Sequence, residues 1–412
     1  MATQQLKHVL DGYKVLDFTQ VLAGPTVTRL LAEMGAEVIK VELMPGGDFS
    51  HNFPFIKDGR SGYYVQQNRG KKSLCIDVKN PKGLAIIKEL LPKVDVVVQN
   101  YAPGVIDRMG LGYEAIKAIN PRIIMCSVSA FGQSGPLSAD PGYDYIAQSY
   151  AAVTYMIGES DGPPLFPMLG LGDVSTGAHA MGAIACALLY RERTGQGQLL
   201  DIALLDCYFH CHEMNVEIYS LSDGAIKPKR SGSHHPQICP AGIFRGKQNY
   251  LFIIAFLDHQ WAKLCEVMGR TELISDPRVN TSPNRLQHLD IVVEAIQGWL
   301  GSTESDDVAL RKLRDARIPV APVLSIEQAV NHPHLRARHT VRKIHDRVLG
   351  EFDAPGFPLK FSAFPEDLPL VAPFLGENNA EVLEKYLGYS ADRVKQLEAE
   401  GILGKAPVRN ER

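Results

Sequence analysis

The sequence lacks the features that mark membrane, secreted and disulfide-bonded proteins. No segment offers the roughly 20 consecutive apolar residues of a membrane-spanning helix. The first residues, Met1–His8, contain no apolar signal core. The seven cysteines are odd in number and mostly lie within apolar segments, a pattern typical of reduced thiols in a cytosolic protein. We therefore expect a cytoplasmic protein with no membrane partner.

The sequence also has little excess charge of either sign. With 43 Lys and Arg against 46 Asp and Glu, the formal net charge is −3, which gives no reason to expect nucleic acid as a partner. Cys207, His210 and Cys211 lie close together in a helical stretch, but no Cys-x-x-Cys pair elsewhere would complete a zinc site. We therefore predict no metal site.

What the sequence does contain is an alternation of strand and helix patterns. Residues 13–20 and 36–42 have strand patterns that flank a helical pattern at 26–34, which predicts a βαβ unit with parallel strands. Further strand patterns, separated by helical ones, follow at residues 73–78, 94–101 and 122–128. This repetition predicts an α/β fold with a doubly wound parallel sheet. The Gly-x-Gly-x-x-Gly turn of dinucleotide-binding sheets is missing after the first strand, which argues against a dehydrogenase.

The second half of the chain predicts a smaller domain. Residues 222–242 are punctuated by Gly, Pro, Ser and His without a regular period, which is typical of a linker or loop. Residues 243–330 combine a pair of strand patterns with three helical stretches, so we expect a smaller α+β domain there. From residue 334 onward a β-rich segment is followed by helical patterns at 379–387 and 391–400.

The rest of the chain is organised around the motif Gly170-Leu171-Gly172-Asp173, which leads into an apolar helical run. Basic residues and then Gly195 end the run, as expected at a helix C-terminus. Asp173 is therefore expected at the N-terminal end of a buried helix, where free N–H groups and the helix dipole favour an anion. The alternative interpretation is that Asp173 or Ser175 is simply an N-cap.

Other polar stretches gather near the predicted strand ends. Ligands of such sheets bind beyond the carboxyl ends of the strands, which places Thr19–Leu22 and Asn100–Tyr101 around one crevice. The run Arg69–Lys72 suits phosphates but equally fits a solvated turn. Asp144, if buried, needs a hydrogen-bond partner or a chemical role. The pair His234-His235 is either part of a polar loop or part of a flap over a site.

Taken together, these stretches resemble the class III CoA-transferase family, which includes formyl-CoA transferase and the carnitine-type CoA-transferases and is homologous to α-methylacyl-CoA racemase. The matching passages run nearly end to end in the expected order: Val15–Pro25, Gly35–Glu42, Asn68–Ser73, Asn100–Gly104, Asp107–Gly110, Gly172–Asp173, Arg191–Gln198, Pro319–Val323 and Leu375–Glu377. The resemblance implies a Rossmann-like large CoA-binding domain built from residues 1–221 and the returning segment 331–412. It also implies a small α+β domain at 222–330 and an interlocked homodimer.

The resemblance further implies roles for individual residues. The nucleophilic aspartate of the family corresponds to Asp173. The CoA contacts would be Val21, Leu22, Ala23, Arg69, Lys71, Asn100, Tyr101 and Arg108. The remaining residues of the substrate site would be Tyr143, Asp144, Gly232 and His235, of which the last two lie in a loop suited to excluding water. Coenzyme A would be a substrate, so no permanently bound cofactor is expected.

We therefore expect transfer of CoA from an acyl-CoA to a carboxylate acceptor through a covalent intermediate on Asp173. A carboxylate with an ordinary pKa of about 3.9 is ionised at neutral pH and needs no base to attack a thioester. The alternative is a 2-methylacyl-CoA racemase or epimerase. Tyr143 disfavours it, because it stands where the racemase branch has a histidine. Gly232–Pro240 replaces the Gly-rich loop of formyl-CoA transferase, which favours a larger acyl group such as succinyl or mesaconyl.

Overall fold

The computed structural model of the chain describes residues 6–406 and divides into two compact units. The first unit comprises the described residues up to Val153, Met168–Glu213 and the residues from Pro333 onward. The second unit comprises Thr154–Pro167 and Met214–His332. The predicted large domain, residues 1–221 and 331–412, also includes residues 1–5 and 407–412, which lie outside the described residues.

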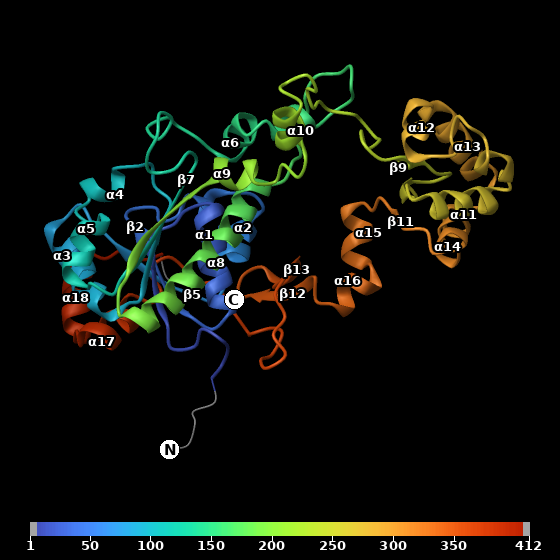
Figure 1. The fold of residues 1–412 in the computed structure, drawn as a ribbon. Helices are drawn as coiled ribbons and strands as arrows, with labels where there is room; N and C mark the ends of the chain where they lie inside the picture. Colours follow the sequence, from blue (N-terminus) through green and yellow to red (C-terminus); the bar gives the residue numbers. More distant parts are fainter. Residues whose placement is uncertain (1–5, 407–412) are drawn as a thin grey trace. The chain divides into compact units, whose positions relative to one another are not determined.

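A six-stranded parallel sheet forms the centre of the first unit (Figure 1). Its strand order is β5-β2-β1-β6-β7-β8, and all neighbouring strands run parallel. The strands are β1 (Lys14–Asp17), β2 (Glu37–Leu43), β5 (Lys71–Ile76), β6 (Val96–Gln99), β7 (Ile124–Ser129) and β8 (Gln198–Ala203). The predicted parallel sheet is confirmed, and the carboxyl ends of its strands share one edge.

Helices cover both faces of this sheet. Val15 and Val38 point toward the face covered by α1 (Ala23–Glu33) and α8 (Leu171–Thr194). The alternate residues Leu16 and Ile39 pack instead in a second apolar cluster with helices from both ends of the chain, as the two-residue period of a strand requires. That cluster receives side chains from α3 (Pro81–Leu90), α4 (Val105–Arg108), α5 (Tyr113–Ile119), α17 (Asn379–Leu387) and α18 (Ala391–Ala399).

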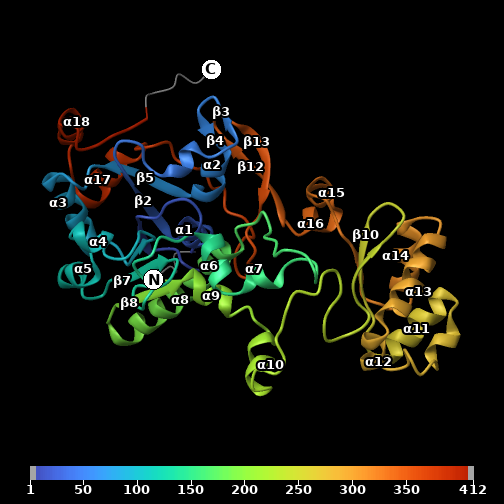
Figure 2. The same ribbon diagram turned by 90° about the horizontal axis from the view of Figure 1, so that it is seen from above.

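The C-terminal segment returns to the first unit. Figures 1 and 2 both show α17 and α18 beside α3, although these helices are far apart in the sequence. The hairpin of β12 (Val341–Asp346) and β13 (Gly350–Pro355) is also held there, because Arg60 Nη2 lies 2.8 Å from Asp346 Oδ2 in a buried ion pair. The other elements assigned wholly to this unit are η1 (Phe49–Asn52), β3 (Ile56–Lys57), β4 (Arg60–Ser61), α2 (Gly62–Asn68), η2 (Leu91–Lys93), α6 (Asp144–Tyr150), α9 (Leu204–Phe209) and α16 (Pro333–Ala337).

The second unit is a small α+β structure with its own apolar core. Its three strands have the order β11-β10-β9 and pair antiparallel. The elements of the unit are α10 (Asn215–Leu221), β9 (Ala241–Arg245), β10 (Tyr250–Ile254), α11 (Asp258–Met268), η3 (Thr271–Ile274), α12 (Ser282–Gln287), α13 (Leu289–Ser302), α14 (Asp306–Asp315), β11 (Val320–Pro322) and α15 (Ile326–Asn331). Trp261, Phe244 and Leu251 lie in the core between the strands and the helices.

The unit boundaries differ from the predicted ones at residues 222 and 330. Residues 204–221, at the end of the predicted large domain, contain the two helices α9 and α10, and the chain changes units between them, after Glu213. Residues 154–167, which the prediction assigned to the large domain, belong to the second unit, where Arg230 Nη2 donates a hydrogen bond of 2.6 Å to the Gly162 carbonyl. The short helix α7 (Val153–Met156) spans this division.

A glycine fixes how closely α1 and α8 pack. A Cβ atom added to Gly177 would lie 2.6 Å from Thr26 Cγ2 and 3.1 Å from the Ala23 carbonyl oxygen, whereas one added to Gly298 in α13 would meet nothing within 4 Å. We predict that Gly177→Ala lowers the thermal midpoint, with a loss of about 1–3 kcal/mol from overpacking. Gly298→Ala is the control and should raise the midpoint, because alanine favours a helix by about 0.5–1 kcal/mol. Calorimetry would contradict this account if both substitutions shifted the midpoint in the same direction.

Candidate active site

The loop after β1 holds a residue in an unusual backbone conformation. Val21 has φ +68°, a region that β-branched residues rarely adopt. Its N–H donates to Asp48 Oδ1 at 3.1 Å. The preceding Gln20 is held at both backbone groups by Asn100, since Gln20 N–H donates to Asn100 Oδ1 and Asn100 Nδ2 donates to the Gln20 carbonyl, each at 2.8 Å. The conformation of this loop is therefore fixed by side chains from other elements.

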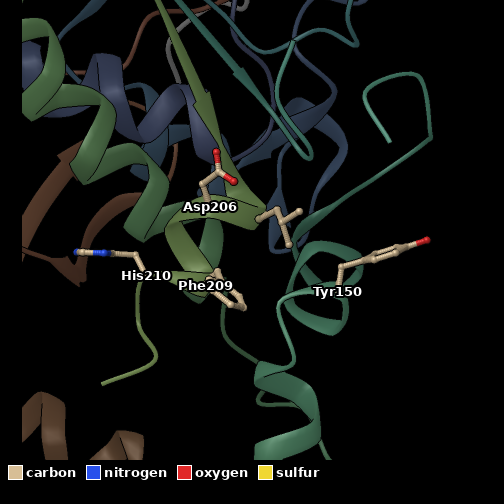
Figure 3. A pocket seen from close by; sticks show the side chains of 5 residues that line it. Tyr150, Asp206, Phe209 and His210 are labelled. Carbon is tan, nitrogen blue, oxygen red and sulfur yellow. The ribbon is translucent and has the colours of Figure 1, made fainter. Parts of the chain in front are cut away.

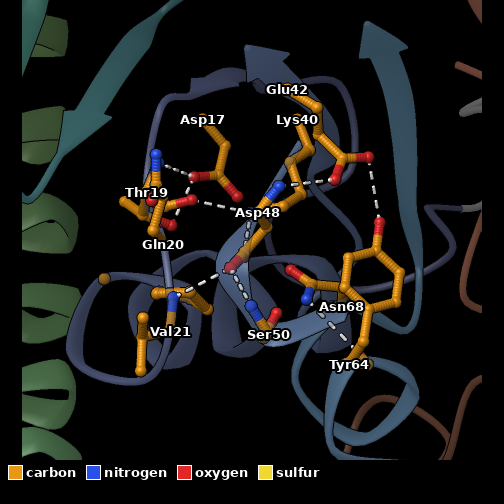
Figure 4. A network of polar contacts seen from close by, with 12 residues as sticks. Asp17, Thr19, Gln20, Val21, Lys40, Glu42, Asp48, Ser50, Tyr64 and Asn68 are labelled. Atoms are coloured by element: carbon orange, nitrogen blue, oxygen red, sulfur yellow. Dashed lines mark hydrogen bonds and ion pairs between the residues drawn. The ribbon is translucent and has the colours of Figure 1, made fainter. Parts of the chain in front are cut away.

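A buried network connects this loop to β2 (Figure 4). Lys40 Nζ donates to the Thr19 carbonyl at 2.7 Å and lies 2.8 Å from Asp48 Oδ2. Burial alone would raise the pKa of Asp48, but Lys40 and the N–H groups of Ser50 and Val21 lower it to about 2. The Asp48 carboxylate is thus ionised across the physiological range and keeps the loop in place.

Asp173 lies in the first turn of α8. The N-cap residue is Gly170 and provides no side-chain hydrogen bond, so the interpretation of Asp173 or Ser175 as an N-cap is wrong. The prediction of a buried helix also needs correction, because Leu171, Val174 and Leu189 are 44%, 49% and 53% exposed within the chain. One side of α8 packs on α1 and the sheet, and the other is apolar but uncovered.

Asp144, from α6, lies directly against this turn. The N–H of Asp173 donates to Asp144 Oδ2 at 3.0 Å, which satisfies one of the backbone donors left free at a helix start. The other oxygen, Oδ1, accepts a short hydrogen bond from the Tyr208 hydroxyl, and Gln148 Nε2 donates to that hydroxyl at 3.1 Å. Asp144, Gln148 and Tyr208 are all buried.

The glycines of the motif make room for these contacts. A Cβ atom on Gly172 would lie 2.1 Å from the Tyr208 ring, and one on Gly170 would lie 2.5 Å from Leu22 Cδ2. Gly172 therefore lets Tyr208 reach Asp144, and Gly170 lets the loop after β1 meet the start of α8. These two approaches bring Leu22, Asp144 and Asp173 into one site.

The electrostatic environment of Asp173 differs from the one we expected. Burial, and secondarily the charge of Asp144, raise the pKa of Asp173 from 3.8 to about 7. The expectation of a fully ionised carboxylate at neutral pH is therefore wrong. Between pH 4 and 7 the folded protein binds the Asp173 proton more tightly than the unfolded chain does, so this group makes folding less favourable as the pH rises through that range.

An aromatic side chain of α2 also faces the carboxylate. Burial raises the pKa of the Tyr63 hydroxyl, and the charges of Asp173 and Asp48 raise it further. The Tyr63 ring packs edge-on against Phe53, at 5.0 Å between ring centroids. The influence of Asp173 on the Tyr63 pKa indicates that the two side chains lie within electrostatic range of each other.

The structure brings some of the predicted CoA contacts near Asp173. Val21 and Leu22 are half-buried at the carboxyl edge of the sheet, and Ala23 is buried at the start of α1. Asn100 follows β6 and fixes the Gln20 backbone, as described above. The Tyr101 ring packs with the second apolar cluster, and Arg108 is exposed at the end of the short helix α4. Their contacts with CoA stay predictions.

Arg69 and Lys71 do not have the environment that we predicted. The Arg69 guanidinium is buried and donates to Glu33 Oε1 from Nε at 3.0 Å and from Nη2 at 2.6 Å. Lys71 Nζ is buried 3.0 Å from Asp17 Oδ2, where burial lowers its pKa to about 8 despite that carboxylate. Each cation therefore forms a buried ion pair with a carboxylate from an earlier element of the chain. Their contacts with CoA stay predictions.

The remaining predicted site residues have different environments. The Tyr143 side chain is 81% exposed and precedes α6, whereas Asp144, the next residue, is buried. Gly232 and His235 lie in the second unit, where the Gly232 N–H donates to the Gly158 carbonyl at 3.0 Å and the His235 N–H donates to the Ala241 carbonyl at 2.9 Å. Their proposed role in excluding water stays a prediction.

An open hollow of about 500 Å³ lies on the outer side of α9, lined by Tyr150, Leu205, Asp206, Phe209 and His210 (Figure 3). It is separate from the contact between Tyr208 and Asp144, because Tyr208 points to the opposite, buried side of α9. Over residues 6–406, no group of three or more His, Cys, Asp or Glu side chains is placed to hold a metal ion. In the same range, none of the helices combines the length and apolar character needed to cross a membrane.

Sequence reasoning missed several residues that shape the site. Tyr208 and Gln148 were not singled out, and neither were Asp48 and Lys40. The glycine at position 172 was the available signal for a close approach, but nothing in the sequence identified Tyr208 as the approaching side chain. Tyr208 follows Gly172 by 36 positions and lies on a separate helix, so no local sequence pattern links the two residues.

Comparison with known proteins identifies the family of the chain. The model of CoA-transferase family III matches residues 10–379. Succinyl-CoA:glutarate CoA-transferase of Mus musculus is 34% identical over 96% of this chain and 90% of its own length. Formyl-CoA:oxalate CoA-transferase of Rhodopseudomonas palustris is 33% identical over 98% of each chain. The crystal structure of a CAIB/BAIF family protein from Brucella suis, 32% identical, matches with a TM-score of 0.82 over 92% of this chain and 100% of that one. The chain therefore belongs to CoA-transferase family III and is a CoA-transferase.

Proposed function

We propose that this enzyme moves CoA from an acyl-CoA to a carboxylate acceptor through covalent intermediates on Asp173. The observation that carries the proposal is the environment of this carboxylate. Asp173 is half-buried in the first turn of α8, at the carboxyl edge of the sheet, and among the described residues no cation pairs with it. An unpaired, poorly solvated carboxylate is a stronger nucleophile than a solvated one, and it becomes uncharged when it is acylated.

The proposed chemistry begins with attack on the thioester. A carboxylate oxygen of Asp173 bonds to the acyl carbonyl carbon, the carbon–sulfur bond breaks, and its electron pair leaves on the CoA thiolate, which gives a mixed anhydride. The thiolate then attacks the Asp173 carbonyl carbon. This forms an aspartyl-CoA thioester and releases the first acid as a carboxylate, which carries one oxygen from Asp173. The acceptor carboxylate repeats the two steps in reverse and leaves as the new acyl-CoA.

The acyl group is proposed to be dicarboxylic, such as succinyl or mesaconyl. The mouse relative is named for succinyl-CoA and glutarate, and the Rhodopseudomonas relative, at nearly the same identity, for formyl-CoA and oxalate. Overall identity therefore does not choose between them. The proposal of a larger group rests on the segment Gly232–Pro240, which contains one glycine and two histidines where a Gly-rich loop is expected for formyl-CoA transferase.

We also propose that the protein works as a homodimer. The support is a series of exposed apolar side chains on neighbouring elements of the first unit. They are Ile146, Tyr150, Leu171, Val174, Leu189, Tyr190, Leu199 and Phe209. Exposed apolar patches of this kind mark interaction surfaces in soluble proteins, and a second copy of the chain is the partner that the family resemblance implies.

The covalent step can be tested by intact mass. Mixed with succinyl-CoA, the protein should gain the mass of one CoA less one water, and hydroxylamine should remove it. Asp173→Ala should abolish the adduct and reduce transfer by about 10⁴-fold or more, because the nucleophile is lost. Asp206→Ala, on the outer side of α9, is the matched control. Oxalyl- and mesaconyl-CoA in parallel would identify the donor. An adduct in the Asp173→Ala protein, or deuterium uptake at the α-carbon of a 2-methylacyl-CoA without any adduct, would contradict the proposal.

The homodimer can be tested by sedimentation. The wild-type protein should sediment as a dimer at micromolar concentration, and Leu189→Glu should weaken association at least tenfold, because it buries a charge in an apolar contact. Leu221→Glu, on α10 of the second unit, is also an exposed leucine and should leave the dimer intact. A wild-type protein that stays monomeric at every concentration would refute the proposal.

A further inference from the structure

Three buried side chains outside the reacting group converge on Asp173. Gln148 of α6 donates to the Tyr208 hydroxyl, Tyr208 of α9 donates to Asp144 Oδ1, and Asp144 Oδ2 accepts the N–H of Asp173. Gln148, Tyr208 and Asp144 are 0%, 3% and 6% exposed. A buried polar side chain lowers the stability of the fold unless its polar atoms form hydrogen bonds. These three hydrogen bonds give partners to polar groups of α6 and α9 at the start of α8.

We propose that Asp144 is a positioning residue that keeps a second negative charge beside Asp173, and that Tyr208 holds it there, so that the uncharged covalent states of Asp173 are favoured over the free carboxylate. This inference rests on the covalent role proposed for Asp173. It assigns functions to Asp144 and Tyr208 that do not require either side chain to touch the substrate.

The hydrogen bonds of Asp144 are those of a buried carboxylate that carries a negative charge. Both of its oxygens act as acceptors, one from a backbone N–H and one from a phenol, which is the bonding pattern of a carboxylate. Asp144 also sits at the N-terminal end of α8, where the helix dipole favours a negative charge. Removal of the Tyr208 hydroxyl takes away one of the two donors that hold the Asp144 carboxylate in place.

Among residues 6–406, no cation acts on the pKa of Asp173. The titratable groups that act on Asp173 or respond to it are Asp144 on α6 and Tyr63 on α2. From the loop before α1, Leu22 meets the start of α8. From α9, Tyr208 points toward Asp144, whereas Asp206 and His210 line the outer hollow. Burial and Asp144 together raise the pKa of Asp173 to about 7, as expected when two carboxylates lie close together in a poorly solvated site.

Acylation removes this repulsion. Free Asp173 carries a negative charge, but in the anhydride and in the aspartyl-CoA thioester its carbonyl carbon is part of an uncharged group. The charge moves to the CoA thiolate in the first step and to the released carboxylate in the second. A fixed charge on Asp144 therefore raises the free energy of the starting carboxylate and not that of the bonded states, which favours formation of the covalent intermediate.

The packing of the motif supports a dedicated position for Tyr208. The ring lies where a Cβ atom on Gly172 would be, at 2.1 Å, so only glycine permits the approach. Gly172 directly precedes Asp173 in the sequence. It makes room for Tyr208, whose hydroxyl orients the Asp144 carboxylate.

Three variants test the inference: Asp144→Asn, Tyr208→Phe, and Tyr219→Phe as a matched control at an exposed tyrosine of α10, in the second unit. The first measurement is the pH dependence of carbodiimide labelling of Asp173 with glycinamide, located by peptide fragmentation, which needs no turnover. We expect a wild-type midpoint near pH 7, a midpoint at least one unit lower in Asp144→Asn, and a smaller decrease in Tyr208→Phe. Tyr219→Phe should match the wild-type protein.

The second measurement is the equilibrium fraction of aspartyl-CoA formed with succinyl-CoA and succinate above pH 8. The equilibrium constant should decrease about tenfold for each unit by which the midpoint decreases. If the wild-type protein forms its Asp173 adduct but neither variant moves the midpoint or the adduct fraction, the inference is overturned and the proposed function stands. If no adduct forms with any acyl-CoA, the proposed function fails, and the preference for covalent states fails with it, whatever the midpoints show. Tyr208→Phe keeps the test decisive if Asp144→Asn does not fold, because it removes only one hydroxyl group.

Discussion

Two carboxylates at the start of α8 form the constraint around which the site is built. Asp144 accepts the N–H of Asp173, so the backbone contact that caps the helix also places the two acidic side chains side by side. Burial leaves Asp173 without enough water to stabilise its charge, and Asp144 adds repulsion. A fold selected only for stability would gain from replacing Asp173, because a poorly solvated carboxylate without a cation is unfavourable. Its retention is understandable if the acidic side chain is needed for a reaction that removes its charge.

The cationic side chains of the first unit serve a different purpose. Lys40, Lys71 and Arg69 are buried and pair with Asp48, Asp17 and Glu33 respectively. Buried ion pairs add little net stability compared with apolar packing, but removal of one partner is strongly destabilising. Through Asp48 and Lys40, this network fixes the strained Val21 and the loop that meets the start of α8. The site thus combines two parts. The loop after β1 comes from the carboxyl edge of the sheet, and the two carboxylates with their hydrogen-bond partners come from α6, α8 and α9.

The sequence allowed much of the fold to be predicted because its signals are local. The βαβ alternation identified the parallel sheet, and Gly195, with φ +76°, ends α8 where the glycine and the preceding basic residues indicated. The candidate nucleophile Asp173 was found from its motif. The burial of Arg69 and Lys71 could not be predicted, because a run of cations does not reveal whether acidic side chains from elsewhere in the sequence will pair with it. Tyr208 could not be found, since its contact with Asp144 joins two helices separated by 64 positions. The raised pKa of Asp173 was likewise unpredictable, because burial and the proximity of Asp144 are properties of the folded chain.

The central claim, that Asp173 is bonded to each acyl group in turn, has a direct isotopic test. In the proposed chemistry, one carboxylate oxygen of the acceptor remains on Asp173 when the new acyl-CoA leaves. A single turnover of CoA-loaded enzyme with ¹⁸O-labelled succinate should therefore leave one heavy oxygen in the peptide that contains Asp173. Acids released over the following turnovers should carry it away, because the Asp173 oxygen that attacks the thioester leaves with the acid. Heavy oxygen found only in the succinyl-CoA product and in unreacted succinate, with none in Asp173, would show that the acyl groups never bond to this residue and would contradict the account.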